Sequence, residues 1–144
     1  MRIDPETERK TKVEAPGQTV TAPPQTLSST VQKIRGGMSF NRAIGQFLDA
    51  FYRHQGDRQP LIYEAPHRTG DDRQDAYVAA VAEHLARTFD MPVPKWTLHQ
   101  SRYLNRPWFL EHGNMAETPV SFRRRMIYTN TDPLWRKTRP VRRG

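Results

Sequence analysis

Apolar residues recur at helical spacing in two segments of the sequence, and these two patterns constrain the fold more than any other feature. From Phe40 to Phe51 they fall at i, i+4, i+7, i+8 and i+11, with mostly polar residues on the other side. In a second segment Tyr77, Val81 and Leu85 fall at i, i+4 and i+8, with several alanines among them. Such spacing places the apolar side chains on one face of a helix. The two segments therefore predict two amphipathic helices, and the alanines allow a close approach between helices.

Capping residues give the expected ends of these helices. Ser39 is expected to cap the first helix, which should end near His54, before a glycine and a proline. Asp71 or Asp72 is expected to cap the second helix, with Gln74 in capping-box register after Asp71. Pro92 and Pro94 are expected to end this helix, because proline has no backbone N–H to donate and its ring clashes with the preceding turn.

A short apolar stripe precedes the first long helix. Leu27, Val31 and Ile34 fall at i, i+4 and i+7 and predict a short helix that ends at Gly36 and Gly37. Together with the helix that follows, this arrangement superficially suits a DNA-binding helix-turn-helix. Ordinary helix pairing is the favoured interpretation, because the second helix has a wide apolar face and few basic residues.

After the second long helix the pattern becomes irregular. Residues 96–110 hold many aromatic and aliphatic side chains among prolines and polar residues, which indicates short helices or turns that cover the two long helices. Thr118 followed by Pro119 is typical of a helix start, with Thr118 as the cap. A short helix is expected to run to Arg125, followed by extended residues 126–128.

These patterns predict one small domain that is mainly helical. Residues 1–26 are rich in proline, threonine and charge and are expected to form a disordered arm. Residues 27–137 are expected to form a single helical domain, with two principal amphipathic helices and an aromatic-rich irregular cover, and residues 138–144 a basic tail. The composition agrees: with the 8 glycines added to the 35% hydrophobic residues, the apolar share is about 41%, below the roughly 45–50% of typical domains.

The charge of the chain is concentrated at its end. Of the 23 basic and 15 acidic residues, eight basic and one acidic lie between residues 120 and 144, so the remaining 119 residues are nearly neutral. This asymmetry indicates an anionic partner, either nucleic acid or an acidic protein surface, although a basic end that only aids solubility is an equal alternative. The candidate contact residues are Arg106, Arg123, Arg124, Arg125, Arg136, Lys137, Arg139, Arg142 and Arg143.

Two aromatic residues, Tyr128 and Trp135, lie among these basic residues. Aromatic rings can stack on bases, and arginines bind phosphate oxygens or carboxylates. Three successive arginines at helical spacing spread around most of the helix. We therefore expect at least one of Arg123, Arg124 and Arg125 to pack inward or to pair with an acidic residue of the domain.

The sequence contains no recognisable catalytic or metal-binding motif. The chain has no cysteine, which excludes disulfides, thiol nucleophiles and cysteine-ligated zinc. The spacing of the five histidines gives no zinc-binding helix, and His84 is expected to be a boundary residue. Asp71, Asp72 and Asp75 suit a helix N-terminus better than a Mg²⁺ site. No nucleophile elbow or phosphate-binding loop is present. We therefore expect no enzymatic activity, metal or cofactor.

The sequence predicts a cytoplasmic protein. No run approaches the roughly 18 apolar residues that a membrane-spanning helix needs, so no contact with a membrane is expected. The first ten residues, MRIDPETERK, lack the apolar core of a signal peptide.

Five blocks follow one another along residues 39–137: AIGQFLDAFY (43–52), DDRQDAYVAAVAEHLA (71–86), PVPKW (92–96), YLNRPWF (103–109) and PVSFRRRMIYTNTDPLWR (119–136). In this order they resemble a widespread, poorly characterised family of small bacterial proteins with FLDxFY, AEHLA, RPWF and FRxRNIF blocks. The chain departs from that pattern at Met126, where asparagine is usual, and at Tyr128, where phenylalanine is usual. The matched motif positions are Arg106, Trp108, Phe109, Phe122, Arg123 and Arg125.

The resemblance implies an antitoxin-like partner of a nucleotidyltransferase-like protein, and it supplies no catalytic residues. The leading hypothesis from the sequence is therefore a binding protein that neutralises a protein partner. The alternatives are a nucleic-acid-binding regulator that uses the basic C-terminal segment, and a phage or bacterial inhibitor protein. An enzyme that uses His84 or the three aspartates is a further alternative, which requires these groups to converge in one pocket.

Overall fold

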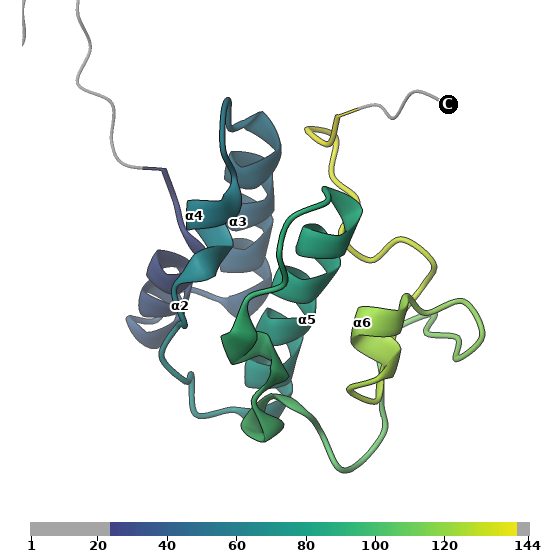
Figure 1. Cartoon of the computed structure of the whole chain (residues 1–144). Helices are drawn as coiled ribbons and strands as arrows, with labels where there is room; N and C mark the ends of the chain where they lie inside the picture. Colours follow the sequence, from purple (N-terminus) through teal and green to yellow (C-terminus); the bar gives the residue numbers. More distant parts are fainter. Residues whose placement is uncertain (1–23, 141–144) are drawn as a thin grey trace, which may run out of the picture.

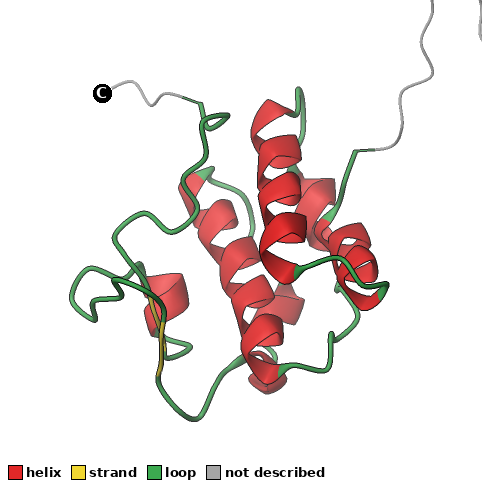
Figure 2. Ribbon diagram, turned by 180° about the vertical axis from the view of Figure 1, so that it is seen from behind, coloured by secondary structure: helices red, strands yellow, loops and turns green. Residues whose placement is uncertain are grey.

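Helix α5 (Asp72–Thr88) lies in the middle of the molecule. Helices α2 (Leu27–Arg35) and α3 (Phe40–Arg53) lie on one side of it, and the loop-rich segment around the last short helix, α6 (Val120–Arg123), lies on the other (Figure 1; Figure 2). The structure, a computed structural model, describes residues 24–140. From Asp75 to Glu83 every residue of α5 is buried, so this helix packs against neighbours around its whole circumference.

The predicted mainly helical fold is confirmed. The apolar face of α3 is buried, and Phe40 and Phe51 contact the ends of α5 through Tyr77 and Phe89, with ring centroids 5.6 and 5.5 Å apart. The alanines of α5 have no exposed surface, which lets neighbouring elements approach the helix axis closely. No helix within residues 24–140 is long and apolar enough to cross a membrane.

The helix ends follow the predicted capping residues in most respects. The side chain of Ser39 accepts a hydrogen bond from the backbone of α3, which ends before His54. Asp71 caps α5 by accepting from the N–H groups of Arg73 and Gln74. The predicted reciprocal bond from Gln74 is wrong: the backbone N–H of Asp71 donates to the hydroxyl of Thr69 at 3.1 Å. Helix α2 ends at Arg35, directly before Gly36 and Gly37, as predicted.

The connector between α3 and α5 contains a short helix, α4 (Gln59–Tyr63), which the sequence patterns did not predict. Leu61 and Ile62 are buried in the core, whereas the ring of Tyr63 is 69% exposed. Helix α4 lies on the side of α5 opposite to α6 (Val120–Arg123) (Figure 1).

The irregular cover over α5 consists of short elements, as predicted. Two turns of 3-10 helix, η1 (Lys95–Leu98) and η2 (Gln100–Arg102), pack on α5. Helix α6, which follows later in the chain, also packs on α5. The strands β2 (Trp108–Phe109) and β3 (Ile127–Tyr128) form a parallel pair that the sequence patterns did not predict. In that pair Trp108 lies opposite Ile127, and Phe109 lies opposite Tyr128.

The start of α6 differs from the prediction by one residue. Pro119 occupies the capping position, and no side chain caps the helix. The hydroxyl of Thr118 instead bonds to the backbone of Asn114 and Thr129, which closes the loop between the two strands. Thr118 was predicted as the cap from its place before a proline, but its tertiary contacts determine its role.

The ends of the chain are described only in part. The predicted N-terminal arm lies outside the described residues, apart from residues 24–26, of which Thr26 caps α2. At the other end, the hydroxyl of Thr138 donates to Asp49 and the side chain of Arg139 pairs with Asp132. Contacts with the domain therefore continue to residue 139.

Gly113 is predicted to be the glycine least tolerant of substitution. A Cβ at this position would collide with the backbone oxygen of Tyr128 and would lie 2.9 Å from that of Leu110. Because neither backbone oxygen can move without disturbing the strand pair, Gly113→Ala should lower the free energy of unfolding by about 1–3 kcal/mol. Urea denaturation would measure this. Gly36→Ala is the control, since its nearest neighbour would lie at 3.4 Å, and an equal effect of both variants would contradict the prediction.

Candidate partner-binding surface

Glu83 lies in the buried run of α5, and three arginines surround its carboxylate. Its Oε1 accepts a hydrogen bond from Nη1 of Arg125 at 2.6 Å. Its Oε2 accepts from Nη1 of Arg124 at 3.0 Å and from Nε of Arg87 at 2.8 Å. Burial alone would raise the pKa of Glu83, but the hydrogen bonds from Arg125 and Arg87 outweigh it and hold the pKa below its usual range. Three guanidinium groups share one carboxylate, so the cluster keeps a net positive charge.

Arg125 is the inward-facing arginine of the predicted basic block. Its side chain has no exposed surface, and it donates to the backbone oxygens of Ser121 at 2.7 Å and Thr97 at 2.6 Å. Its guanidinium also lies 4.5 Å from the centre of the Tyr103 ring. The prediction that one of the three arginines packs inward is confirmed, and this residue joins α6 to α5 and to η1.

Arg136 attaches the C-terminal segment to α3. It forms two hydrogen bonds with the carboxylate of Asp49, at 3.0 and 2.7 Å, in the parallel geometry that suits guanidinium and carboxylate. Gly45 leaves the space for this guanidinium, because a Cβ there would lie 3.0 Å from its Nη1. Further along, Arg139 pairs with Asp132 at 2.7 Å.

The structure therefore divides the predicted basic residues into groups. Arg124, Arg125, Arg136 and Arg139 each pair with a carboxylate. Three others are exposed: Arg106, Lys137 and Arg123, whose Nη1 donates to the backbone oxygen of Thr118 at 3.2 Å. Arg142 and Arg143 lie outside the described residues.

Several exposed apolar side chains belong to the cover, whereas α3 and α5 carry no large exposed apolar side chain. Phe109 is 54% exposed, Met115 55% and Val120 49%, and all three come from the segment between β2 and α6. The ring of Phe109 rests on Tyr128, with centroids 4.7 Å apart, so its position is fixed although much of its surface is open. Arg106 and Arg123 flank these residues in the sequence.

A second exposed aromatic residue lies in a shallow hollow at the C-terminal end of α3. Trp135 is 56% exposed and borders a depression of about 490 Å³. The other lining residues are Asp49, Arg53, Arg136, Lys137 and Thr138.

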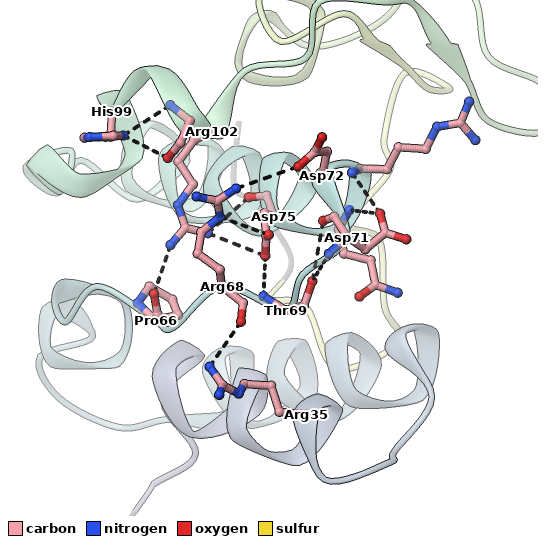
Figure 3. Close-up of polar contacts among 12 residues, drawn as sticks. Arg35, Pro66, Arg68, Thr69, Asp71, Asp72, Asp75, His99 and Arg102 are labelled. Carbon is pink, nitrogen blue, oxygen red and sulfur yellow. Dashed lines mark hydrogen bonds and ion pairs between the residues drawn. The ribbon is translucent and has the colours of Figure 1, made fainter.

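Of the three aspartates at the start of α5, only Asp71 caps the helix as predicted, and the other two have other partners (Figure 3). Asp75 is fully buried and accepts from the backbone N–H of Thr69 at 2.7 Å and from Nε of Arg68 at 3.0 Å. Asp71 caps the helix, and Asp72 lies 3.7 Å from Arg68 at the surface. Residues 24–140 contain no group of three histidine or acidic side chains that is arranged to hold a metal ion.

His84 lies at the edge of the core. Its ring packs on Phe122, with centroids 5.8 Å apart, and burial lowers its pKa. Its place at the boundary agrees with the prediction. The aspartates at the start of α5 lie about 2.5 to 3.6 helical turns away, so His84 and these carboxylates do not converge.

The sequence patterns missed the acidic partners Glu83 and Asp49. A signal for Glu83 was present, because a single charge within the alanine-rich apolar run of α5 requires a cation, and Arg87 follows four residues later. No comparable local signal identifies Asp49, whose partner Arg136 is 87 residues away in the sequence.

Comparison of the chain with protein-family models, with curated proteins and with solved structures found no match. The resemblance to small bacterial antitoxin-like proteins stays a prediction from the sequence. The chemistry of the described residues is therefore what supports an assignment of function.

Replacement of Glu83 is predicted to destabilise the fold strongly. Glu83→Gln would leave the fully buried guanidinium of Arg125 without a counter-charge, which typically costs about 3–5 kcal/mol. Urea denaturation at pH 7 would measure the change. Glu64→Gln is the control, since the same chemical change there affects an exposed residue. A loss below about 1 kcal/mol for Glu83→Gln would show that the pair is not required.

The ion pair between Asp49 and Arg136 predicts a pH-dependent contribution to stability. The hydrogen bond from Arg136 lowers the pKa of Asp49 from 3.8 to about 2. A carboxylate with a lowered pKa stabilises the fold fully above its unfolded value and loses that effect as the pH falls through the folded value. The difference in unfolding free energy between the parent protein and Asp49→Asn should therefore be constant from pH 7 to 5 and shrink between about pH 4 and 2.

Chemical denaturation at a series of pH values would check this dependence. Asp72→Asn, in which the replaced carboxylate is 85% exposed, is the control and should give a small difference throughout. A difference for Asp49→Asn that persists unchanged at pH 2 would contradict the assigned pairing.

Proposed function

We propose that the protein is an antitoxin-like binding protein that neutralises a partner protein by covering part of its surface. The observation that carries this proposal is the exposure of three apolar side chains within twelve residues of the cover, since Phe109, Met115 and Val120 are each about half exposed. Exposed apolar groups on a rigid support are typical of protein interaction sites.

The residue types of this surface suit a protein partner. Aromatic residues, methionine and arginine are the types enriched at protein interfaces. Arg106 and Arg123 are exposed near these apolar residues in the sequence, and they favour a partner whose contact surface is acidic.

A buried ion pair holds one end of the segment that carries these residues. Arg125 follows α6 directly and binds Glu83 on α5, so the end of the cover cannot shift without breaking a buried ion pair. A surface that is already in its binding conformation loses little conformational entropy on association. This supports a role in which the chain binds as a preformed body.

A nucleic-acid-binding regulator is a weaker proposal for the function as a whole. Arg125 is fully buried, and Arg136 and Arg139 each pair with a carboxylate of their own, which reduces the positive charge available to phosphates. An inhibitor protein of a phage or a bacterium would use the same apolar surface, and the identity of the partner distinguishes the two cases.

Co-purification with the product of the neighbouring gene tests the proposal. The two proteins should elute together from a sizing column at micromolar concentration. If they elute separately, the antitoxin-like assignment loses its support.

Substitution of the exposed apolar residues is predicted to weaken this complex. Phe109→Ser combined with Met115→Ser should reduce affinity for the partner by about tenfold or more, because central aromatic contacts at interfaces typically contribute above 1 kcal/mol each. Isothermal titration calorimetry would measure it. Tyr63→Ser is the matched control, since that ring is 69% exposed on α4, on the other side of α5 (Figure 1). Equal weakening by both variants would contradict the location of the surface.

A further inference from the structure

The segment that carries Trp135 is fixed on both sides of an exposed indole. Leu134 is 1% exposed in the core, and its backbone oxygen accepts a hydrogen bond from the hydroxyl of Tyr52 at 2.8 Å. On the other side, Arg136 forms its two hydrogen bonds with Asp49. Trp135 itself is 56% exposed. The segment thus holds a large aromatic face toward solvent in a defined position.

The charges around this indole are not balanced. Arg136 and Asp49 neutralise each other, while Arg53 and Lys137 also line the hollow. Neither of these two forms an ion pair with a carboxylate among residues 24–140. The hollow therefore combines one open aromatic face with two cations that form no ion pair within the described part of the chain, an arrangement that suits a stacked base and its phosphate.

We propose that this hollow binds a nucleotide unit of single-stranded nucleic acid, with the base stacked on Trp135 and the phosphate between Arg53 and Lys137. The site differs from the apolar surface proposed for the protein partner and does not depend on it. It uses Lys137, which forms no ion pair with a carboxylate of residues 24–140, rather than the paired arginines of the basic end.

The shape of the site favours a strand over a free nucleotide. The hollow is open to solvent, whereas sites for free small molecules usually enclose most of the ligand. Trp135 and Arg136 also line a second, smaller hollow of about 160 Å³ toward the start of α3. A strand that passes the indole would therefore find depressions on both sides of it, which a single nucleotide would not use.

The residues also favour a single strand over a duplex or an acidic peptide. The bases of a duplex are stacked on one another, so an indole cannot reach their faces without unstacking them. The carboxylates of an acidic peptide would satisfy Arg53 and Lys137, but they would leave the indole of Trp135 without a stacking partner. Base stacking is the interaction that requires both the indole and the cations.

Fluorescence anisotropy with a labelled eight-nucleotide oligothymidine tests the proposal on the full chain. Trp135→Ala should weaken binding about fivefold or more, and Trp135→Phe should restore part of the affinity, because a smaller ring still stacks. Arg53→Glu and Lys137→Glu should each weaken binding and reduce the slope of log affinity against log salt by about 0.7, the value for one phosphate on a single strand. Lys95→Glu is the control, since it changes the net charge equally at an exposed residue outside the hollow.

The outcomes separate the alternatives. Thymidine monophosphate should bind far more weakly than the oligonucleotide, and a matching duplex should not show the loss with Trp135→Ala. Equal affinity for the monophosphate and the oligonucleotide would contradict the proposal that the ligand is a strand. The ligand would then be a free nucleotide. If Trp135→Ala leaves oligonucleotide binding unchanged, or Lys95→Glu weakens it as much as Lys137→Glu does, the proposal is wrong and the binding is non-specific attraction.

If Trp135→Ala weakens the complex with the partner protein instead, the hollow is a protein-binding site and the proposal is also wrong. The double variant at Phe109 and Met115 should bind the oligonucleotide as the parent protein does. Failure of the nucleotide site and failure of the antitoxin-like function are thereby distinguishable.

Discussion

The arrangement of the whole cover depends on the buried ion pairs that the carboxylate of Glu83 forms with arginines. This carboxylate has no access to water, and it is held in the core of the molecule by guanidinium groups from two parts of the chain. Arg125 holds the end of α6 against α5, and β3 begins two residues later in the chain. Because a buried carboxylate without cations is unstable, the cover and the central helix stabilise each other. The cover is part of the core structure, even though it consists mostly of loops.

The long helices were predictable because their information is local. The spacing of apolar residues defines α3, and the short polar residues before α3 and α5 mark where these helices begin. The parallel pair of β2 and β3 could not be predicted in this way, since each strand has two residues and the pairing joins positions 19 residues apart. Thr118 shows the same limit: its local pattern is that of a cap, but a contact with Thr129 determines where its hydroxyl points.

The candidate surface was predictable by residue type but not by role. The sequence places many arginines near the end of the chain, and one of them was expected to face inward. Which ones are neutralised depends on acidic residues distant in sequence, as with Arg136 and Asp49. Only a structure distinguishes an arginine that stabilises the fold from one that is free to bind a partner. The role proposed for Trp135 likewise depends on tertiary structure, because its neighbours are fixed while the indole itself is exposed.

The contact between the C-terminal segment and α3 has a consequence for how the protein is made. Leu134 fills part of the core, and Arg136 pairs with the first long helix, although more than 80 residues separate them from their partners. During synthesis on the ribosome, α3 therefore emerges long before the residues that complete its packing. Until residues 134–139 have been translated, part of its surface remains open to other proteins, including chaperones.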